Sequence, residues 1–222
     1  MSFAGMALAL LYVSGVIGSP SVYSNQSVAT GKGGVADEGR AGVHIMAFGD
    51  SLTAGYGLEN SHSFPVVLER RLRELGYAVR VTNAGVSGDT SAGGAARISW
   101  ALADRPDILI LELGANDALQ GLSPKHTREN LEAVIRTCQA QGVKVLLAGM
   151  QAPRNLGQEY AAAFDALYPE LAKAFDLVFY PFFLEGVAFD ATLNLPDGMH
   201  PNPAGVERVV QGMLPFVLGM LE

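Results

Sequence analysis

Residues 43–57 read V-H-I-M-A-F-G-D-S-L-T-A-G-Y-G, an apolar run that ends abruptly at Gly49-Asp50-Ser51. The run predicts a buried strand, and Leu52-Thr53-Ala54 predicts the start of a helix. Ser51 therefore lies at a strand-to-helix corner, on the sheet edge where α/β proteins usually bind their ligands. Taken alone, Gly-Asp-Ser is more typical of a turn with a capping side chain than of a nucleophile.

The rest of the chain alternates short apolar runs with amphipathic segments. Further strands are predicted at 78–82, 107–113, 143–148 and 177–180, and each is followed by a helical pattern, the last at 204–221. Strands that alternate with helices indicate a parallel sheet covered on both faces. Right-handed crossovers then favour an α/β fold with three α/β/α layers and a flavodoxin-like order of five strands.

Composition and charge narrow the class of protein. The 222 residues are 49% hydrophobic and 17% charged, which suits one globular domain with a full core. Fifteen Lys and Arg against 22 Asp and Glu give a net charge of -7, so neither nucleic acid nor an anionic membrane is a predicted partner. The single cysteine, Cys138, excludes an internal disulfide, and its apolar neighbours at helical spacing predict a packed position.

The N-terminal part differs from the rest. Residues 1–18 contain an almost wholly apolar run, 3–18, that resembles the hydrophobic part of a secretory signal, although no Lys or Arg precedes this run. An export signal, an uncleaved anchor and a mis-assigned start all stay open. Residues 19–42 are rich in Ser and Gly and predict a flexible linker before a domain at 43–222. We expect no stable membrane insertion of that domain, and a periplasmic or secreted location, or a cytoplasmic one if 1–18 is not a signal.

The last predicted loop carries a carboxylate and an imidazole, in the sequence Asp197-Gly198-Met199-His200. An aspartate three residues before a histidine can accept a hydrogen bond from the ring Nδ1–H and leave Nε2 free as a base. In a parallel sheet this loop opens on the same edge as Ser51. Together the three side chains predict a nucleophile, a base and an orienting acid.

Acyl transfer also needs hydrogen-bond donors for the oxyanion. The backbone N–H groups of Ser51 and Gly88 and the side-chain amide of Asn116 are the candidates. Singly, Gly88 is equally well explained by a tight turn and Asn116 by a helix cap. Their joint occurrence at the ends of separate strands favours a site.

Four stretches, in this order and spacing, resemble the sequence blocks of the SGNH (GDSL) hydrolases: Gly49-Asp50-Ser51-Leu52, Gly88-Asp89-Thr90, Gly114-Ala115-Asn116-Asp117 and Asp197-Gly198-Met199-His200-Pro201. The resemblance extends over 43–221 and is to the arylesterase and thioesterase I/lysophospholipase L1 branch. It implies the SGNH hydrolase fold, with Ser51 as nucleophile, Gly88 and Asn116 in the oxyanion hole, and Asp197 and His200 as the other triad members. No Gly-x-Ser-x-Gly elbow supports the ordinary α/β-hydrolase alternative.

The sequence thus predicts a serine esterase that acts on small aryl or short-to-medium acyl esters through an acyl-enzyme on Ser51. Thioesters and lysophospholipids are the next substrates in order of preference. The chemistry requires no metal or organic cofactor. The oligomeric state is left open. Predicted substrate contacts, which packing explains equally well, are Asp50, Leu119, Leu122, Met150 and Pro153.

Two other functions stay open at this stage. A carbohydrate O-deacetylase on the same fold would need aromatic residues that stack on sugars, and Trp100, the only tryptophan, is predicted in a helix. A non-catalytic flavodoxin-like module would need a phosphate-binding loop after the first strand, where the charge of Asp50 would repel phosphate.

Overall fold

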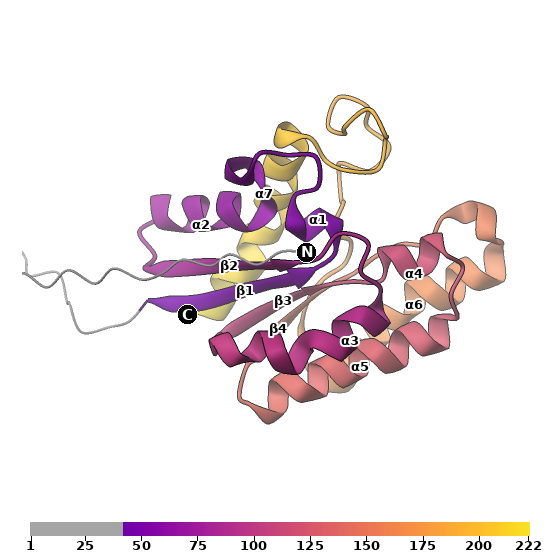
Figure 1. Ribbon diagram of the computed structural model, residues 1–222, viewed down its shortest axis with the longest axis horizontal. Coiled ribbons are helices and arrows are strands. Elements are labelled where there is room, and N and C mark those ends of the chain that lie inside the picture. Colours follow the sequence, from indigo (N-terminus) through magenta and orange to yellow (C-terminus); the bar gives the residue numbers. More distant parts are fainter. Residues whose placement is uncertain (1–41) are drawn as a thin grey trace, which may run out of the picture. The chain divides into compact units, whose positions relative to one another are not determined.

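The computed structural model describes residues 42–222, coloured by sequence position in Figure 1. The predictions for 1–18 and 19–42 lie outside the described residues, apart from Gly42. The described part contains a central sheet with helices on both of its faces (Figure 1).

The sheet consists of five parallel strands in the order β2-β1-β3-β4-β5. This confirms the predicted parallel sheet and its flavodoxin-like strand order. The central strands are apolar on both faces because helices cover both, which is why they appear as continuous apolar runs. Their bounds are β1 Val43–Gly49, β2 Val79–Gly85, β3 Ile108–Glu112, β4 Lys144–Ala148 and β5 Val178–Tyr180.

Seven α-helices accompany these strands within residues 42–222. Helices α2 and α7 lie on one face of the sheet, and α3, α5 and α6 lie on the other (Figure 1). Helices α1 and α4 are short and stand at the carboxyl ends of β1 and β3. The bounds are α1 Ser51–Ala54, α2 Phe64–Glu74, α3 Ser91–Ala101, α4 Ala115–Leu119, α5 Pro124–Ala140, α6 Gln158–Phe175 and α7 Pro203–Leu221.

Two local differences from the predicted elements lie beside the site. Strand β2 continues to Gly85 instead of ending at Thr82, because it stays paired with β1 up to Gly49. Helix α1 is a single turn capped by Gly55, whose φ of 84° is the left-handed conformation that glycine adopts readily. A short helix at a strand end keeps Ser51 at the surface of the sheet edge.

Helix α7 is the one helix of residues 42–222 that is long and apolar enough to cross a membrane by length and composition. Its apolar side belongs to the core, where Val206, Val210, Met213 and Val217 are buried. Cys138 is likewise fully buried on α5, as predicted, and burial raises the pKa of its thiol to about 12. Both features are explained by packing.

Candidate active site

A chain of hydrogen bonds links Ser51, His200 and Asp197 at the carboxyl edge of the sheet. Ser51 is the first residue of α1, and its Oγ lies 2.9 Å from His200 Nε2. His200 Nδ1 lies 2.7 Å from Asp197 Oδ2. The structure therefore brings together the three side chains predicted as a triad, although 149 positions separate the serine from the histidine.

The turn around Asp197 explains the orientation of the imidazole. Asp197 Oδ1 accepts hydrogen bonds from the backbone N–H groups of Met199 at 2.9 Å and His200 at 3.0 Å. These hydrogen bonds, with that from the His200 side chain, lower the pKa of Asp197 to about 2. The ionised carboxylate selects the tautomer with a proton on Nδ1, so the lone pair of Nε2 faces the serine hydroxyl.

The predicted oxyanion donors lie in two different settings. The N–H groups of Ser51 and Gly88 donate no backbone hydrogen bond within residues 42–222. The Asn116 amide donates both of its hydrogens, to Asp50 Oδ2 at 3.1 Å and to the backbone carbonyl of Asp89 at 2.9 Å. An oxyanion would have to share one of these hydrogens, so the donor role of Asn116 stays a prediction.

Gly88 requires glycine because of its backbone conformation. A Cβ at this position would meet no protein atom within 4 Å. Its φ of 84° nevertheless favours glycine, because L-residues with a side chain rarely adopt that conformation. Gly88 is not among the residues that line the cleft beside Ser51. Its role as an oxyanion donor also stays a prediction.

Asp50 lines the cleft beside Ser51, and its contact with substrate stays a prediction. The side chain is fully buried, and Oδ1 accepts the N–H of Leu52 at 3.0 Å as the N-cap of α1. Its other oxygen accepts from Asn116. Burial raises the pKa of Asp50 to about 6, against the opposing effect of the bond from Leu52. Asp50 borders the cleft as a structural link between the Ser51 turn and Asn116.

A cleft of about 650 Å³ opens beside Ser51 and His200. Leu119, Met150 and Pro153 line it as predicted, whereas Leu122 does not. The carbonyl of Leu122 instead accepts a hydrogen bond from the Tyr160 hydroxyl at 2.8 Å. Apolar side chains that the sequence did not single out form much of the remaining wall: Phe182, Leu184, Ala188, Phe189 and Met199.

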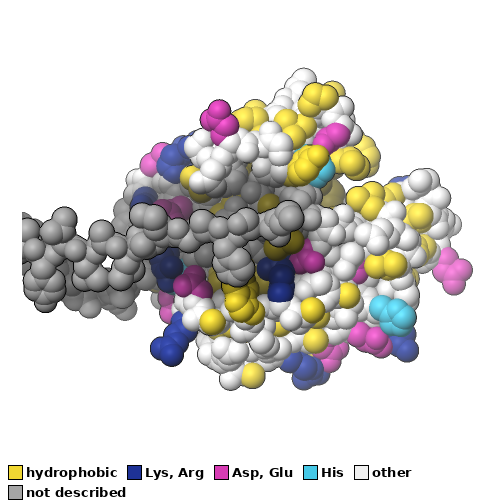
Figure 2. Space-filling model, in the orientation of Figure 1, with side chains coloured by type: hydrophobic (Ala, Val, Ile, Leu, Met, Phe, Trp, Pro, Cys, Tyr) yellow, Lys and Arg dark blue, Asp and Glu magenta, His cyan; other side chains and the backbone are white. Residues whose placement is uncertain are grey.

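The mouth of this cleft is apolar as well. Phe189 is 99% exposed and has a φ of 67°, an uncommon combination for a bulky side chain. Leu119 and Met199 are also exposed. Figure 2 shows hydrophobic side chains gathered at the upper right, where the segment between β5 and α7 lies in Figure 1. Such a rim suits the alkyl or aryl part of a ligand.

Comparison with known proteins identifies the family. The sequence profile of the GDSL-like lipase/acylhydrolase family matches residues 47–208. The chain belongs to this family. It is 39% identical to esterase TesA of Pseudomonas aeruginosa over 80% of this chain and 89% of that protein. It is 38% identical to an arylesterase of Vibrio mimicus, over 74% of this chain and 82% of the relative.

Among solved structures, AlinE4, an esterase of the SGNH-hydrolase family, has a TM-score of 0.69 and 45% sequence identity. The match covers 82% of this chain and 97% of that one. The SGNH resemblance and the fold predicted from the sequence are thereby confirmed.

Several residues around the site of this family member were missed by the sequence patterns. Arg97 on α3 binds Asp89 at 2.7 Å and donates to the carbonyls of Ala84 and Gly49, so it joins the ends of β1 and β2. The Tyr56 ring lies 4.6 Å from the His200 ring, centroid to centroid. Glu112, the last residue of β3, is fully buried beneath the Ser51 turn. None of the three belongs to a motif that periodicity reveals.

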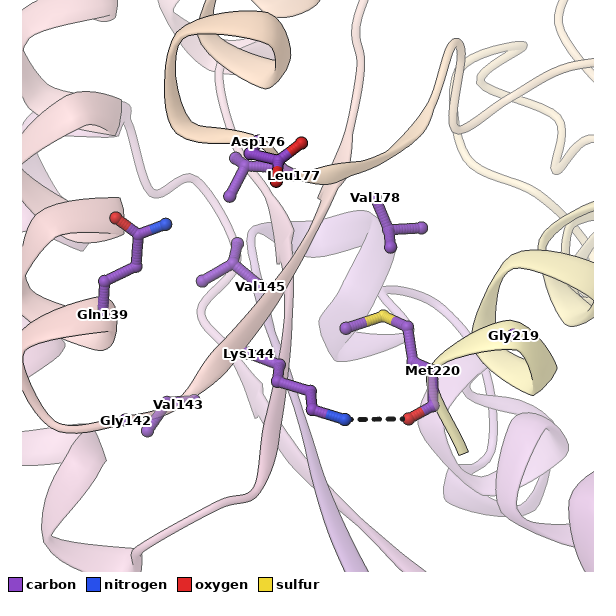
Figure 3. A pocket seen from close by; sticks show the side chains of 10 residues that line it. All are labelled: Gln139, Gly142, Val143, Lys144, Val145, Asp176, Leu177, Val178, Gly219 and Met220. Carbon is purple, nitrogen blue, oxygen red and sulfur yellow. Dashed lines mark hydrogen bonds between the residues drawn. The ribbon is translucent and has the colours of Figure 1, made fainter. Parts of the chain in front are cut away.

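A second cavity lies at the opposite, amino-terminal edge of β4 and β5 (Figure 3). Lys144 Nζ donates to the backbone carbonyl of Met220 at 3.4 Å, near the C-terminal end of α7. The other polar side chains drawn there are Gln139 and Asp176. No serine or histidine lines this cavity, and within residues 42–222 no group of three or more His, Cys, Asp and Glu is placed to hold a metal ion.

Proposed function

We propose that this member of the GDSL-like family is a serine esterase in which Ser51 attacks the carbonyl carbon of a carboxylic ester. The single observation that carries the proposal is the hydrogen-bonded chain from Ser51 Oγ through His200 to Asp197, with lengths of 2.9 and 2.7 Å. The arrangement supplies a nucleophile, a base and an orienting acid within hydrogen-bond reach of one another.

The first half of the reaction forms an acyl-enzyme. His200 Nε2 takes the Ser51 proton as Oγ bonds to the ester carbonyl, and the resulting imidazolium is stabilised by Asp197. The tetrahedral intermediate then collapses, the alcohol oxygen leaves with the proton from His200, and the acyl group stays on Ser51. In the second half, water gives its proton to His200 and releases the acid in the same way.

In this proposal the oxyanion is stabilised by the predicted donors, which are the backbone N–H groups of Ser51 and Gly88 and the side-chain amide of Asn116. Asn116→Ala is expected to lower kcat by about 100- to 1,000-fold with little change in KM, because the donor acts on charge that develops only in the transition state. The matched control is Asn155→Ala, since Asn155 also lines the cleft. Steady-state hydrolysis of p-nitrophenyl butyrate measures both variants. A kcat within threefold of wild type in Asn116→Ala would exclude the donor role.

The apolar wall indicates an ester with an alkyl or aryl acyl group. In a p-nitrophenyl series from acetate to palmitate, kcat/KM is expected to rise from acetate to medium chains, by up to about tenfold per two methylenes buried. Phe189→Ala is expected to weaken this rise while it leaves acetate hydrolysis nearly unchanged.

Trp100→Ala is the control for that substitution, because Trp100 is also an exposed aromatic residue, at 80%, but does not line the cleft. If both variants kept the wild-type chain-length profile, Phe189 would have no contact with the acyl chain. If wild type released acetate from acetylated sugars and ignored every alkyl ester, the carbohydrate deacetylase would replace the esterase proposed here.

A further inference from the structure

A buried carboxyl group supports the turn that carries Ser51. Glu112 ends β3 directly opposite Gly49, the last residue of β1. Its Oε2 accepts the hydroxyl hydrogen of Thr53 at 2.7 Å and the backbone N–H of Asp50 at 3.3 Å. These two groups flank Ser51 in the sequence. Glu112 therefore contacts the turn on both sides of the nucleophile without touching it.

The packing at this corner leaves no free space. A Cβ on Gly49 would overlap both Thr53 Oγ1 and Glu112 Oε2. Thr53 and Asp50 are fully buried, as is Glu112. A side chain that fits so closely under a turn fixes its backbone, and displacement of a nucleophile by about 1 Å can cost about 100-fold in rate.

The hydrogen bonds distribute charge unequally between the two neighbouring carboxyl groups. Asp50 accepts N–H donors on both oxygens, from Leu52 and Asn116, which favours its ionised form. Glu112 Oε1 is the buried side-chain oxygen of residues 42–222 that has no hydrogen-bond partner. An unpaired oxygen is far less costly on a neutral carboxylic acid than on a carboxylate.

The groups that face Glu112 do not reverse this preference. Asp50 adds a negative charge, and Tyr168 of α6 donates its hydroxyl hydrogen to the backbone carbonyl of Leu113. Arg97 of α3 donates a hydrogen bond to the backbone carbonyl of Gly49, the residue opposite Glu112, but its charge is paired with that of Asp89. Burial, and after it the charge of Asp50, raises the pKa of Glu112 well above its ordinary value.

We propose that Glu112 is a positioning residue of the esterase: as a neutral carboxylic acid it holds the turn so that Ser51 stays aligned with His200. Its neutrality leaves the negative charge of this pair of carboxyl groups on Asp50, whose carboxylate orients the Asn116 amide. The inference rests on the proposed role of Ser51, so turnover by wild type and its loss in Ser51→Ala come first in any test.

The kinetic test separates the shape of Glu112 from its charge. Glu112→Gln keeps the shape and the neutral state, and its kcat is expected to stay within about threefold of wild type. Glu112→Ala removes both hydrogen-bond acceptors and is expected to lower kcat by about 10- to 100-fold with KM nearly constant. Glu129→Ala, on the exposed face of α5, is the control. A wild-type kcat in Glu112→Ala, or a loss in Glu112→Gln as large as that in Glu112→Ala, would overturn the proposal.

If Glu112→Ala does not fold, Thr53 provides the same test. Thr53→Val removes the hydroxyl that donates a hydrogen bond to Glu112 and keeps the volume of the side chain. Thr53→Ser retains the hydroxyl. A lower kcat in Thr53→Val that Thr53→Ser rescues is the expected result. Equal kcat in all three proteins would overturn the positioning role.

The protonation state has a test that does not depend on activity. At a pH above the ordinary pKa of a glutamate, Glu112 is ionised in the unfolded chain. In the folded chain the proposal keeps it protonated, so unfolding releases one proton. Relative to Glu112→Gln, the unfolding equilibrium constant of wild type should therefore increase with pH, by about tenfold per pH unit wherever Glu112 is protonated in the folded chain and ionised in the unfolded one. Asp50 has a pKa of about 6 in the folded wild type, so the two proteins are compared above about pH 7. Parallel pH dependences would show that Glu112 is ionised and would overturn the proposal.

Discussion

Ser51→Ala is expected to lower kcat for p-nitrophenyl butyrate by about 10⁴- to 10⁶-fold, an effect as large as that of any single substitution in this chain. The hydroxyl forms the covalent bond to the acyl group, and the methyl group that replaces it cannot. Alanine leaves α1 and its Asp50 cap in place, because the cap bond involves the N–H of Leu52. The variant is therefore expected to unfold at the wild-type temperature and to bind substrate normally.

Ser63→Ala is the matched control for that substitution. Ser63 precedes α2 and donates its hydroxyl hydrogen to the backbone carbonyl of Asn60, outside the cleft. Its kcat should equal that of wild type. More than a tenth of the wild-type rate in Ser51→Ala, in protein free of wild-type contamination, would contradict the assignment of Ser51 as nucleophile.

His200→Ala is expected to have an effect of the same size, about 10⁴- to 10⁶-fold in kcat, because the serine hydroxyl is a weak nucleophile without its base. The two residues act as a unit, so the double variant Ser51→Ala/His200→Ala should be no slower than Ser51→Ala alone. The same assay with single and double variants measures this. Losses that multiply would show that His200 acts independently of Ser51.

The pH dependence of wild-type kcat/KM follows from the same geometry. Mild acid should not lower activity through the orienting acid of the triad. Asp197, with a pKa of about 2, keeps its charge throughout and adds no step of its own. His126→Ala, at an exposed position of α5, should leave both the profile and kcat unchanged.

The sequence predicted the fold because its signals are local and consistent. Apolar runs, helix caps and chain reversals marked all five strands, and the rule that parallel strands present their loops on one edge then placed Ser51 near Asp197 and His200. The Asp-x-x-His spacing predicted the hydrogen bond to Nδ1 because three residues of turn suffice to form it.

The surroundings of the triad depend on register and packing, which local patterns do not contain. Glu112 is an ordinary polar end to an apolar strand until β3 pairs with β1 and sets it opposite Gly49. The position of Arg97 depends on how α3 packs over the ends of two strands. The apolar residues around Phe189 that line the cleft belong to the long segment between β5 and α7. The residues of this segment follow neither a helical nor a strand period.

The central claim, an acyl-enzyme on Ser51, is tested most directly by trapping the nucleophile. Wild type is incubated with an alkyl p-nitrophenyl phosphonate, and the intact mass and the labelled peptide are read by mass spectrometry. The account predicts one phosphonyl group per chain, located on Ser51, with loss of activity in proportion to labelling and no label in Ser51→Ala. Complete inactivation with the label on any other residue, or equal labelling of Ser51→Ala, would contradict it.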